Sequence, residues 1–545
     1  MSLTSLPPGT DDAKDVVSQT ILIDGTPLSN EIELAQITVN KTFNKIASAK
    51  VVLLDGSASD RDFPLSDGEL FKPGNTITIQ LGYHQDVDTV FEGIIVKHAI
   101  KARQNGSSVL VIEAKDEAIK LTAARKSAYY INQTDSSVIE AIASEFAPEV
   151  DSTSYSHPQL IQFESTDWDF ICTRAEANGM LVLTDDGTLV VKKPSASDDA
   201  VLTATYGDNI FEFEAEMDAR RQPESVDSAS WDYTKQELEE SEFGSADFDE
   251  AGDLSSDDLG GVLGGAVTLD HPGHLTPDQL QAWSDAVALR SQLSKAVGRV
   301  RIEGNAEVKP GSVITLDGVG DRFNGDVLVT GVLHTYDGNW LTDIQFGWSD
   351  DWFYTKENVM QAPASGLLPG VSGLQIGLVL DTDDSKVGQY RVKVHVPTIT
   401  SGKQGLWARV ATLDAGAKRG AYFRPQPNDE VVLGFLGSDP REPIILGYLH
   451  SKGKHESPLP EEEGKEQFGF VTKAGLKLVF DDSNKRISLV VPSGAAGKKT
   501  ITVNNDSGAL EFKDENQNTI KMDKSGITIQ SSKIVTIKGA QVKIN

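Results

Sequence analysis

The last seventy or so residues constrain the fold most, because apolar side chains there occupy every second position. The alternation runs from Leu476 to Ile544 and is interrupted by turn residues such as Asp481-Asp482 and Asn504 to Gly508. A period of two places the apolar side chains of a strand on one face, and the other face here carries Lys, Thr, Ser and Glu. A single layer of strands with one apolar face cannot enclose a core, so that face must pack against something else.

Self-association is the simplest way to cover this face. Three copies around a threefold axis would close a prism with the apolar faces inside, as neighbouring units do in repeat architectures. Closure would also hide the strand edges. The alternative is that the face packs on earlier domains of the same chain. We predict a trimer whose core is formed by Leu476, Leu478, Phe480, Ile487, Leu489, Ile501, Val503, Leu510, Ile520, Ile527, Ile529, Val535, Ile537, Val542 and Ile544.

Residues 1–223 show the alternation and turn residues that are typical of strands. Two helices interrupt this pattern. One begins after Thr134 or Asp135, and the other runs from Thr166, where the sequence suits a capping box, to Gly179. We therefore predict a β-rich first domain region with two helices.

Residues 266–360 predict a second β-rich domain region that opens with a helix. Thr276 suits the N-cap, Pro277 the first helical position and Gln279 the reciprocal capping position, while Gly298 suits the residue just past the end. Strands are predicted in the remainder of this region.

Five short strands are predicted in residues 374–450, which suits a small barrel of the OB type. Linkers are predicted before it at 361–373 and after it at 451–468, so the terminal repeat occupies 469–545. OB barrels often bind nucleic acid, but this segment carries nine basic and eight acidic residues and no basic strip of exposed aromatics. We therefore expect no nucleic-acid binding.

The net negative charge of the chain is unevenly distributed. The 545 residues include 50 Lys+Arg and 81 Asp+Glu, a net charge of −31, which argues against a general binder of nucleic acid or anionic membranes. Residues 224–258 alone hold thirteen acids and one base, whereas Phe470 to Asn545 has a net charge of +5. We predict that 224–265 is an acidic, Gly-rich surface loop, in preference to a docking segment for a basic partner.

No arrangement of residues in the sequence predicts catalysis, a metal site or a cofactor. Only His271 and His274 lie near each other, and spacing suggests no third ligand. The nucleophile-elbow, phosphate-loop and zinc-protease motifs are absent from the sequence. Cys172 lies in an apolar helix and suits a small core residue, and Asp381, Asp383 and Asp384 suit a turn. We therefore predict that the protein is not an enzyme.

The N-terminal sequence has no basic segment followed by an apolar one, and nowhere do 18 apolar residues run together. We expect synthesis in the cytoplasm without a signal peptide, with any export by another route.

Several stretches carry a family resemblance. Residues 407–411, 419–425, 428–435 and 437–447, the last reading Gly-Ser-Asp-Pro-Arg-Glu-Pro-Ile-Ile-Leu-Gly, resemble the OB-fold signature of VgrG-type spike proteins. These proteins belong to type VI secretion systems, contractile phage tails and extracellular contractile injection systems. Ser165 to Ile171 is similar to the hub motif of the family, and Gly475 to Asp482 is similar to the opening of its β-helical needle.

The resemblance implies a mainly β, multidomain trimeric spike with barrel-like hub domains, an OB-fold neck and a C-terminal intertwined β-helical prism. Its function would be to link the inner tube and baseplate to a membrane-puncturing tip and to transmit the force of contraction. The implied partners are two further copies of the chain, inner-tube and baseplate proteins at the hub, a PAAR-like tip protein and, transiently, the target membrane. The tip protein would sit on Gln541, Lys543 and Asn545.

Two departures from the family pattern sharpen this expectation. Some phage homologues insert a lysozyme domain between barrel and needle, but residues 451–468 leave no room for one. Some secretion-system members continue into an effector domain, whereas this sequence stops at Asn545. Together these features favour an extracellular injection particle. The rival hypothesis is a trimeric tail protein that binds or degrades polysaccharide, which would need paired carboxylates in a cleft with aromatic platforms.

Overall fold

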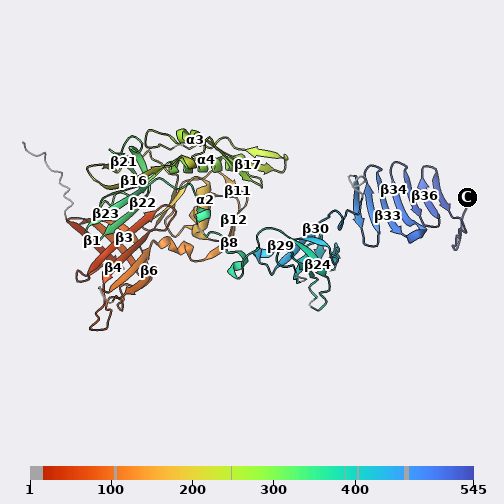
Figure 1. Ribbon diagram of the computed structural model, residues 1–545, viewed down its shortest axis with the longest axis horizontal. Coiled ribbons are helices and arrows are strands. Elements are labelled where there is room, and N and C mark those ends of the chain that lie inside the picture. Colours follow the sequence, from red (N-terminus) through yellow and green to blue (C-terminus); the bar gives the residue numbers. More distant parts are fainter. Residues whose placement is uncertain are drawn as a thin grey trace, which may run out of the picture. The chain divides into compact units, whose positions relative to one another are not determined.

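The computed structural model describes residues 16–103, 107–246, 248–356, 358–386, 388–401, 404–459 and 466–544. The chain divides into two units, with the boundary between Gln361 and Ala362, and Figure 1 shows the elements of each. The boundary falls at the start of the linker predicted at 361–373, where the structure has a short 3-10 helix at Pro363–Gly366.

Most strands of the first unit join one sheet. It contains β1 (Val17–Ile23), β2 (Thr26–Pro27), β3 (Leu34–Thr42), β4 (Ser48–Leu54), β5 (Thr76–Tyr83), β6 (Asp86–Lys101), β7 (Val109–Lys115), β15 (Leu202–Thr205), β16 (Ile210–Met217), β20 (Ala296–Glu303), β21 (Val313–Asp317), β22 (Gly325–Tyr336) and β23 (Trp340–Phe346). Its order is β16-β20-β23-β22-β3-β4-β7-β6-β5-β1-β2, with β21 on β22 and β15 on β21.

This sheet joins the two regions predicted at 1–223 and 266–360. Strand β22 pairs with β3 from Gly331 opposite Thr42 to Tyr336 opposite Ile37. The cores also draw on both regions, since Trp340 lies in the core that contains Phe91 and Ala204 lies in the core that contains Val329. The two regions therefore form one sheet with shared cores. The sequence did not predict this, because pairing between distant segments leaves no local signal.

Residues 117–192 form the helical part of the first unit. The elements are a 3-10 helix (Glu117–Thr122), β8 (Arg125–Tyr130), β9 (Gln133–Thr134), α1 (Asp135–Ile142), β10 (Glu149–Val150), β11 (Ser156–His157), β12 (Leu160–Thr166), α2 (Asp167–Ala177), β13 (Leu181–Asp185) and β14 (Thr188–Lys192). Both predicted helix starts are confirmed, since Thr134 caps α1 and Thr166 caps α2. Trp168, Ile171 and Cys172 of α2 are buried in the core of this part.

The prediction of a surface loop at 224–265 is wrong. This segment contains β17 (Ser225–Asp232), β18 (Glu237–Glu240) and α3 (Ser256–Leu263), and a sheet of order β18-β17-β19 is completed by β19 (Ala266–His271). Small hydroxyl side chains replace large apolar ones on its inner face: Ser228 is buried and donates to the carbonyl oxygen of Leu280 at 2.8 Å. A prediction that counts only large apolar residues misses this kind of packing.

The helix predicted after Thr276 is present as α4 (Pro277–Ser294), and α5 (Phe353–Lys356) follows later in the chain. The predicted stop at Gly298 is wrong, because that glycine lies within β20. A Cβ atom there would come within 2.4 Å of the Phe346 ring and 2.5 Å of the Glu214 carbonyl oxygen, so close sheet packing explains the glycine.

The second unit begins with a closed barrel, which confirms the prediction for residues 374–450. It is formed by β24 (Gln375–Asp381), β25 (Val392–His395), β26 (Leu406–Val410), β29 (Glu430–Phe435) and β30 (Pro443–Tyr448), in the order β24-β25-β26-β30-β29. A small hairpin of β27 (Ala415–Gly416) and β28 (Arg419–Gly420) extends from it. Apolar residues such as Val394, Val431 and Leu433 are fully buried inside.

The terminal repeat forms an antiparallel meander of seven strands, seen in Figure 1 in blue. They are β31 (Gln467–Val471), β32 (Lys477–Asp481), β33 (Arg486–Pro492), β34 (Lys498–Asn504), β35 (Ala509–Lys513), β36 (Thr519–Asp523) and β37 (Gly526–Gln530). The chain is therefore mainly β, as predicted. Among the described residues of either unit, no helix is long and apolar enough to cross a membrane.

Candidate assembly face of the C-terminal sheet

Two ladders of apolar side chains cross all seven strands of the meander. In the first, residues directly opposite each other on successive strands are Phe470, Leu478, Leu489, Ile501, Phe512, Ile520 and Ile529. In the second, they are Phe468, Phe480, Ile487, Val503, Leu510, Met522 and Ile527. Directly opposite side chains project from the same face, so these fourteen residues form one surface, here named the apolar face.

The apolar face is more exposed than the polar face behind it. Along β33, Ile487 and Leu489 are 45% and 48% exposed, whereas Ser488 and Val490, which project from the other face, are less exposed. This reverses the usual arrangement in a soluble sheet, where the apolar side is covered and the polar side faces water. An exposed apolar surface of this extent marks an interaction site.

Turn chemistry fixes the register that keeps the ladders aligned. Lys485, Gly508 and Gln517 have positive φ angles of 45°, 62° and 66° in the turns that follow β32, β34 and β35. Asp481 accepts hydrogen bonds from the Asn484 side chain at 3.0 and 3.1 Å and from its backbone N–H at 3.0 Å, and these bonds lower the pKa of Asp481 to about 2. The carboxylate is thus charged at neutral pH and holds its turn closed.

The opposite face of the meander is polar and carries both signs of charge. Thr502, Glu511, Lys521 and Thr528 lie opposite one another on β34 to β37. Lys521 pairs with Asp523 at 2.9 Å. This polar face is suited to contact with water, whereas the apolar face is suited to burial against another surface.

Covering the apolar face is worth a substantial free energy. Complete burial of a large apolar side chain contributes about 1.5–3 kcal/mol, so a half-exposed one still has about 1 kcal/mol to gain. For the full set of side chains this amounts to on the order of 10 kcal/mol per chain. Such a gain is enough to drive association against its entropic cost.

The structure brings together ten of the predicted core residues on the apolar face: Leu478, Phe480, Ile487, Leu489, Ile501, Val503, Leu510, Ile520, Ile527 and Ile529. Leu476 directly precedes β32 and is 43% exposed. The face also contains Phe468, Phe470, Phe512 and Met522, which the predicted core omitted. The alternation Phe468-Gly469-Phe470 signals the first pair, although 468 had been assigned to a linker.

The segment after β37 differs from the prediction. Val535, Ile537, Val542 and Ile544 alternate in sequence, but residues 531–544 contain no strand. A strand needs a neighbour to take its hydrogen bonds, and β37 is the last that has one within the chain. Of the predicted tip-protein seat, Gln541 and Lys543 are exposed in this segment, and Asn545 lies outside the described residues.

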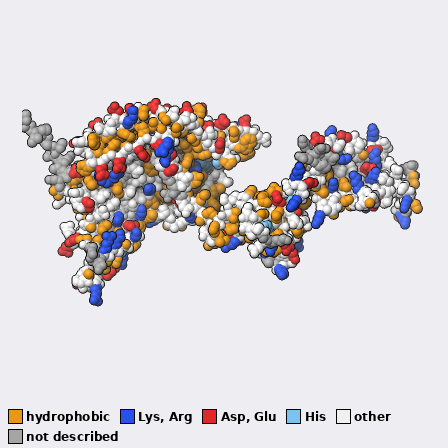
Figure 2. Space-filling model, in the orientation of Figure 1, with side chains coloured by type: hydrophobic (Ala, Val, Ile, Leu, Met, Phe, Trp, Pro, Cys, Tyr) orange, Lys and Arg blue, Asp and Glu red, His pale blue; other side chains and the backbone are white. Residues whose placement is uncertain are grey.

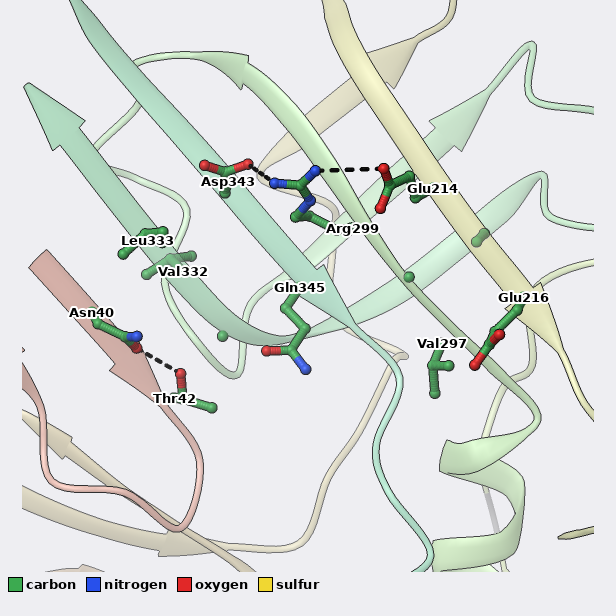
Figure 3. A pocket seen from close by; sticks show the side chains of 13 residues that line it. Asn40, Thr42, Glu214, Glu216, Val297, Arg299, Val332, Leu333, Asp343 and Gln345 are labelled. Atoms are coloured by element: carbon green, nitrogen blue, oxygen red, sulfur yellow. Dashed lines mark hydrogen bonds and ion pairs between the residues drawn. The ribbon is translucent and has the colours of Figure 1, made fainter. Parts of the chain in front are cut away.

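The first unit contains a polar groove of about 580 Å³ on its large sheet (Figure 3). Arg299 of β20 reaches Asp343 of β23 at 3.1 Å and Glu214 of β16 at 3.7 Å, and Gln345 lies beside them. Because the guanidinium is already paired with carboxylates on both neighbouring strands, we interpret these residues as cross-links within the sheet.

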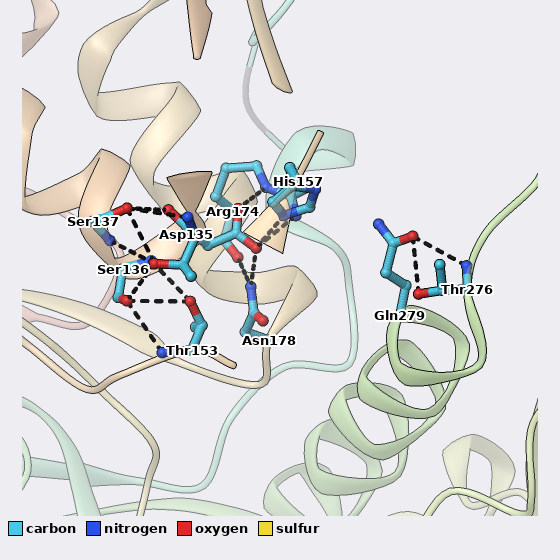
Figure 4. Close-up of polar contacts among 10 residues, drawn as sticks. Asp135, Ser136, Ser137, Thr153, His157, Arg174, Asn178, Thr276 and Gln279 are labelled. Atoms are coloured by element: carbon cyan, nitrogen blue, oxygen red, sulfur yellow. Dashed lines mark hydrogen bonds and ion pairs between the residues drawn. The ribbon is translucent and has the colours of Figure 1, made fainter. Parts of the chain in front are cut away.

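A second polar cluster surrounds Asp135 at the start of α1 (Figure 4). The carboxylate accepts hydrogen bonds from His157 at 2.9 Å, from Arg174 at 2.6 and 2.9 Å and from Asn178 at 3.0 Å. Burial raises the pKa of Asp135, but the bonds from His157 and Arg174 outweigh that effect and hold its pKa below the ordinary value. The cluster therefore links α1, β11 and α2. It lines a cavity of about 630 Å³.

The residues considered for chemistry lie apart from one another. His271 contacts Gly273 of its own loop, and the ring of His274 packs on Tyr233. Cys172 is buried in the helical core. In the part of the chain that the structure describes, no three His, Cys, Asp or Glu side chains are placed to hold a metal ion.

Comparison with known protein families matches most of the first unit to one of them. Residues 13–337 match the family described as the Alg8 N-terminal domain. The chain belongs to this family. The Alg8 N-terminal domain thus accounts for most of the first unit. In the second unit, residues 375–450 match the type VI secretion system/phage-baseplate injector OB domain. The second match coincides with the closed barrel.

The type VI secretion system spike protein VgrG3 of Vibrio cholerae is 31% identical over 125 residues. The matched part is 21% of this chain and 12% of VgrG3, so the chain spans about an eighth of that relative's length. Together with the injector OB domain, this match confirms the predicted similarity to VgrG-type spike proteins.

Comparison with solved structures finds matches at low identity. A tail protein from Neisseria meningitidis has 15% identity and a TM-score of 0.45, with coverage of 62% of this chain and 98% of that one. A prophage MuSo2 43 kDa tail protein from Shewanella oneidensis has 12% identity and a TM-score of 0.47, with coverage of 61% and 99%. A chain of the Francisella PdpA–VgrG complex has 12% identity and a TM-score of 0.41, with coverage of 95% and 88%.

Proposed function

We propose that this chain is the central spike of a contractile injection machine and that it acts as a homotrimer. The observation that carries this proposal is the apolar face, which is continuous across seven strands and exposed in one chain. The injector OB domain at 375–450 and the match to a VgrG spike protein support the same function. Three apolar faces would meet on a common axis and bury one another.

The proposed role is mechanical. In a closed prism the strands run across the needle, and every backbone hydrogen bond of the meander resists shear between successive strands. Contraction of a sheath would supply the work, the hub would connect to the inner tube and baseplate, and the barrel would form the neck. A stiff trimer can transmit such a load because its packed core does not deform continuously.

The remaining partners follow from the same proposal. A PAAR-like tip protein would sit on the C-terminal end of the needle at Gln541, Lys543 and Asn545, and the tip would contact a target membrane briefly. The net charge of +5 on Phe470 to Asn545 suits brief contact with an anionic surface. We further propose that the chain itself has no enzymatic activity, so that purified trimer would release no sugars from peptidoglycan. Its place is a phage tail-like particle that is released from the cell.

Two substitutions in β34 test the trimer. Ile501 lies on the apolar face and is 39% exposed, whereas its neighbour Thr502 lies on the polar face. Ile501→Asp would bury three carboxylates at the axis and should leave the full-length protein monomeric by mass photometry. Thr502→Asp adds the same charge to the outside and should leave a trimer. A trimer from Ile501→Asp at wild-type concentrations would contradict the proposal.

A further inference from the structure

The small sheet of residues 225–271 has an outer face that carries exposed apolar side chains. Trp231 of β17 lies directly opposite Leu238 of β18, and Ala229 lies between Glu240 of β18 and Asp270 of β19. Side chains directly opposite each other share a face, and alternate residues along a strand share it too. Trp231, Leu238, Asp227, Glu240 and Asp270 therefore form one surface, here named the acidic–apolar face.

The apolar centre of this face is exposed. Trp231 and Leu238 are 42% and 58% exposed, whereas Ser228 and Ser230 on the inner side of β17 are each 1% exposed. On the inner side, Ser228 donates to the carbonyl oxygen of Leu280 in α4 and Ser230 donates to that of Leu275, just before the helix. Figure 1 shows β17 at one end of the first unit, and Figure 2 shows hydrophobic and acidic side chains side by side there. Half-exposed tryptophan is enriched at protein–protein interfaces and is costly to leave in water.

The carboxylates around this centre are not neutralised. No Lys, Arg or His of the described chain forms an ion pair with Asp227, Glu240 or Asp270. The one base of residues 224–258, Lys235, is already paired with Glu239 at 2.6 Å and Asp232 at 3.6 Å. The face is thus an apolar pair surrounded by free negative charge, which attracts cations and repels nucleic acid and anionic lipid.

The free edge of this sheet favours a partner segment in an extended conformation. The strand order β18-β17-β19 leaves β18 as an edge, and no other strand of the described chain pairs with it. An edge strand offers unpaired backbone groups to an extended segment of another chain. The glutamates on β18 discourage pairing with a second copy of this acidic sheet but favour a basic strand.

We propose that the acidic–apolar face binds an extended, basic segment of a partner protein. A Lys or Arg of that segment would lie over the Trp231 ring, an arrangement that is favourable within about 6 Å of the ring centre. Neighbouring basic residues would pair with Asp227, Glu240 and Asp270, and the backbone would add to the edge at β18. This binding function is separate from the trimer proposed above, and neither depends on the other.

A synthetic peptide tests the proposal on the full-length protein. The probe is a fluorescent eight-residue peptide in which Lys and Val alternate, and the control peptide has Glu in place of each Lys. Fluorescence anisotropy should show binding of the Lys peptide that weakens steeply as salt rises, since exposed charge pairs are screened. No binding of the Lys peptide, or equal binding of the Glu peptide, would overturn the proposal.

Matched variants separate the face from the net charge. Trp231→Ala removes the ring and Glu240→Gln removes one carboxylate of the face, and each should weaken the Lys peptide by about tenfold. Glu237→Gln removes the same charge from an exposed residue of β18 on the opposite side of the strand and should leave binding within about twofold. Equal weakening by Glu240→Gln and Glu237→Gln would show that overall charge attracts the peptide, and the proposal would fail.

The native partner can be identified by photo-cross-linking. A benzoylphenylalanine at position 231 in the full chain, expressed with the rest of its particle, should form an adduct with a segment of net positive charge in another protein. An adduct with a second copy of this chain, with an acidic or neutral segment, or no adduct would refute the assignment. Because residue 231 is exposed, the thermal unfolding midpoint should stay at the wild-type value in every variant.

Discussion

Substitution of one residue on the apolar face gives a quantitative test of the proposed trimer. Leu489 lies in β33, in the first ladder between Leu478 and Ile501, and is 48% exposed in the single chain. Leu→Ala at a fully buried site costs about 2–5 kcal/mol. Roughly half of the Leu489 surface is already buried within the chain, so about 1–2.5 kcal/mol of that cost belongs to assembly.

Threefold symmetry multiplies this cost. Three copies lose about 3–7 kcal/mol, which lowers the trimer association constant by about two to five powers of ten. Because a trimer association constant depends on the inverse square of concentration, the concentration of half-dissociation should rise by about 10-fold to 300-fold. Contacts that relax around the smaller side chain would place the result near the lower end.

The assay is a dilution series followed by mass photometry or sedimentation velocity. Ser488→Ala is the matched control, because Ser488 precedes Leu489 in β33 and lies on the polar face. Leu489→Ala should dissociate at higher concentration than the wild type, and Ser488→Ala should match the wild type. Equal dissociation of Leu489→Ala and Ser488→Ala would mean that something other than a second copy covers the apolar face.

Three further predictions concern stability. Burial lowers the pKa of His334 to about 3, so the folded first unit keeps this His neutral while the unfolded chain protonates it below pH ~6.5. Calorimetry should therefore show that the free energy of unfolding falls by about 2 kcal/mol between pH 6.5 and 5. His334→Asn should abolish this pH dependence. Arg290→Met removes the cation that faces the buried Glu176 carboxylate, which then keeps its hydrogen bonds from the Phe353 backbone N–H but no opposite charge from Arg290. This should cost about 3–5 kcal/mol in urea unfolding, whereas Arg290→Met with Glu176→Leu should recover most of it. Leu433→Ala in the barrel core should cost about 2–5 kcal/mol, with an unchanged unfolding midpoint for the first unit.

Local patterns in the sequence were sufficient wherever a single element decides its own structure. The meander could be predicted because a period of two is unambiguous when the turns contain Asp, Asn and Gly. The starts of α1, α2 and α4 could be predicted because capping depends on residues three positions apart. Pairing of β22 with β3 joins residues about 290 positions apart, and no local rule encodes such a contact.

For the candidate sites too, local patterns predicted some residues and missed those that depend on the folded sheet. Ten of the predicted core residues on the apolar face followed from alternation, but Phe468 was missed because the Pro and Glu residues of the preceding segment predicted a linker that extended to residue 468. The sheet of 225–271 was missed because its inner face uses Ser228 and Ser230 in place of large apolar side chains. Its acidic composition predicted solvation, yet the same charge surrounds an exposed tryptophan once the strands form.

The two proposed binding surfaces should respond to salt in opposite ways. The apolar face carries no charge in either ladder, and its association depends on apolar burial, which salts such as sulfate strengthen. The acidic–apolar face depends on free carboxylates at Asp227, Glu240 and Asp270, whose attraction falls as the Debye length shortens from about 10 Å at 0.1 M to about 3 Å at 1 M. High salt should therefore release a basic partner from the hub while the needle stays trimeric, which allows the partner to be removed without dismantling the spike.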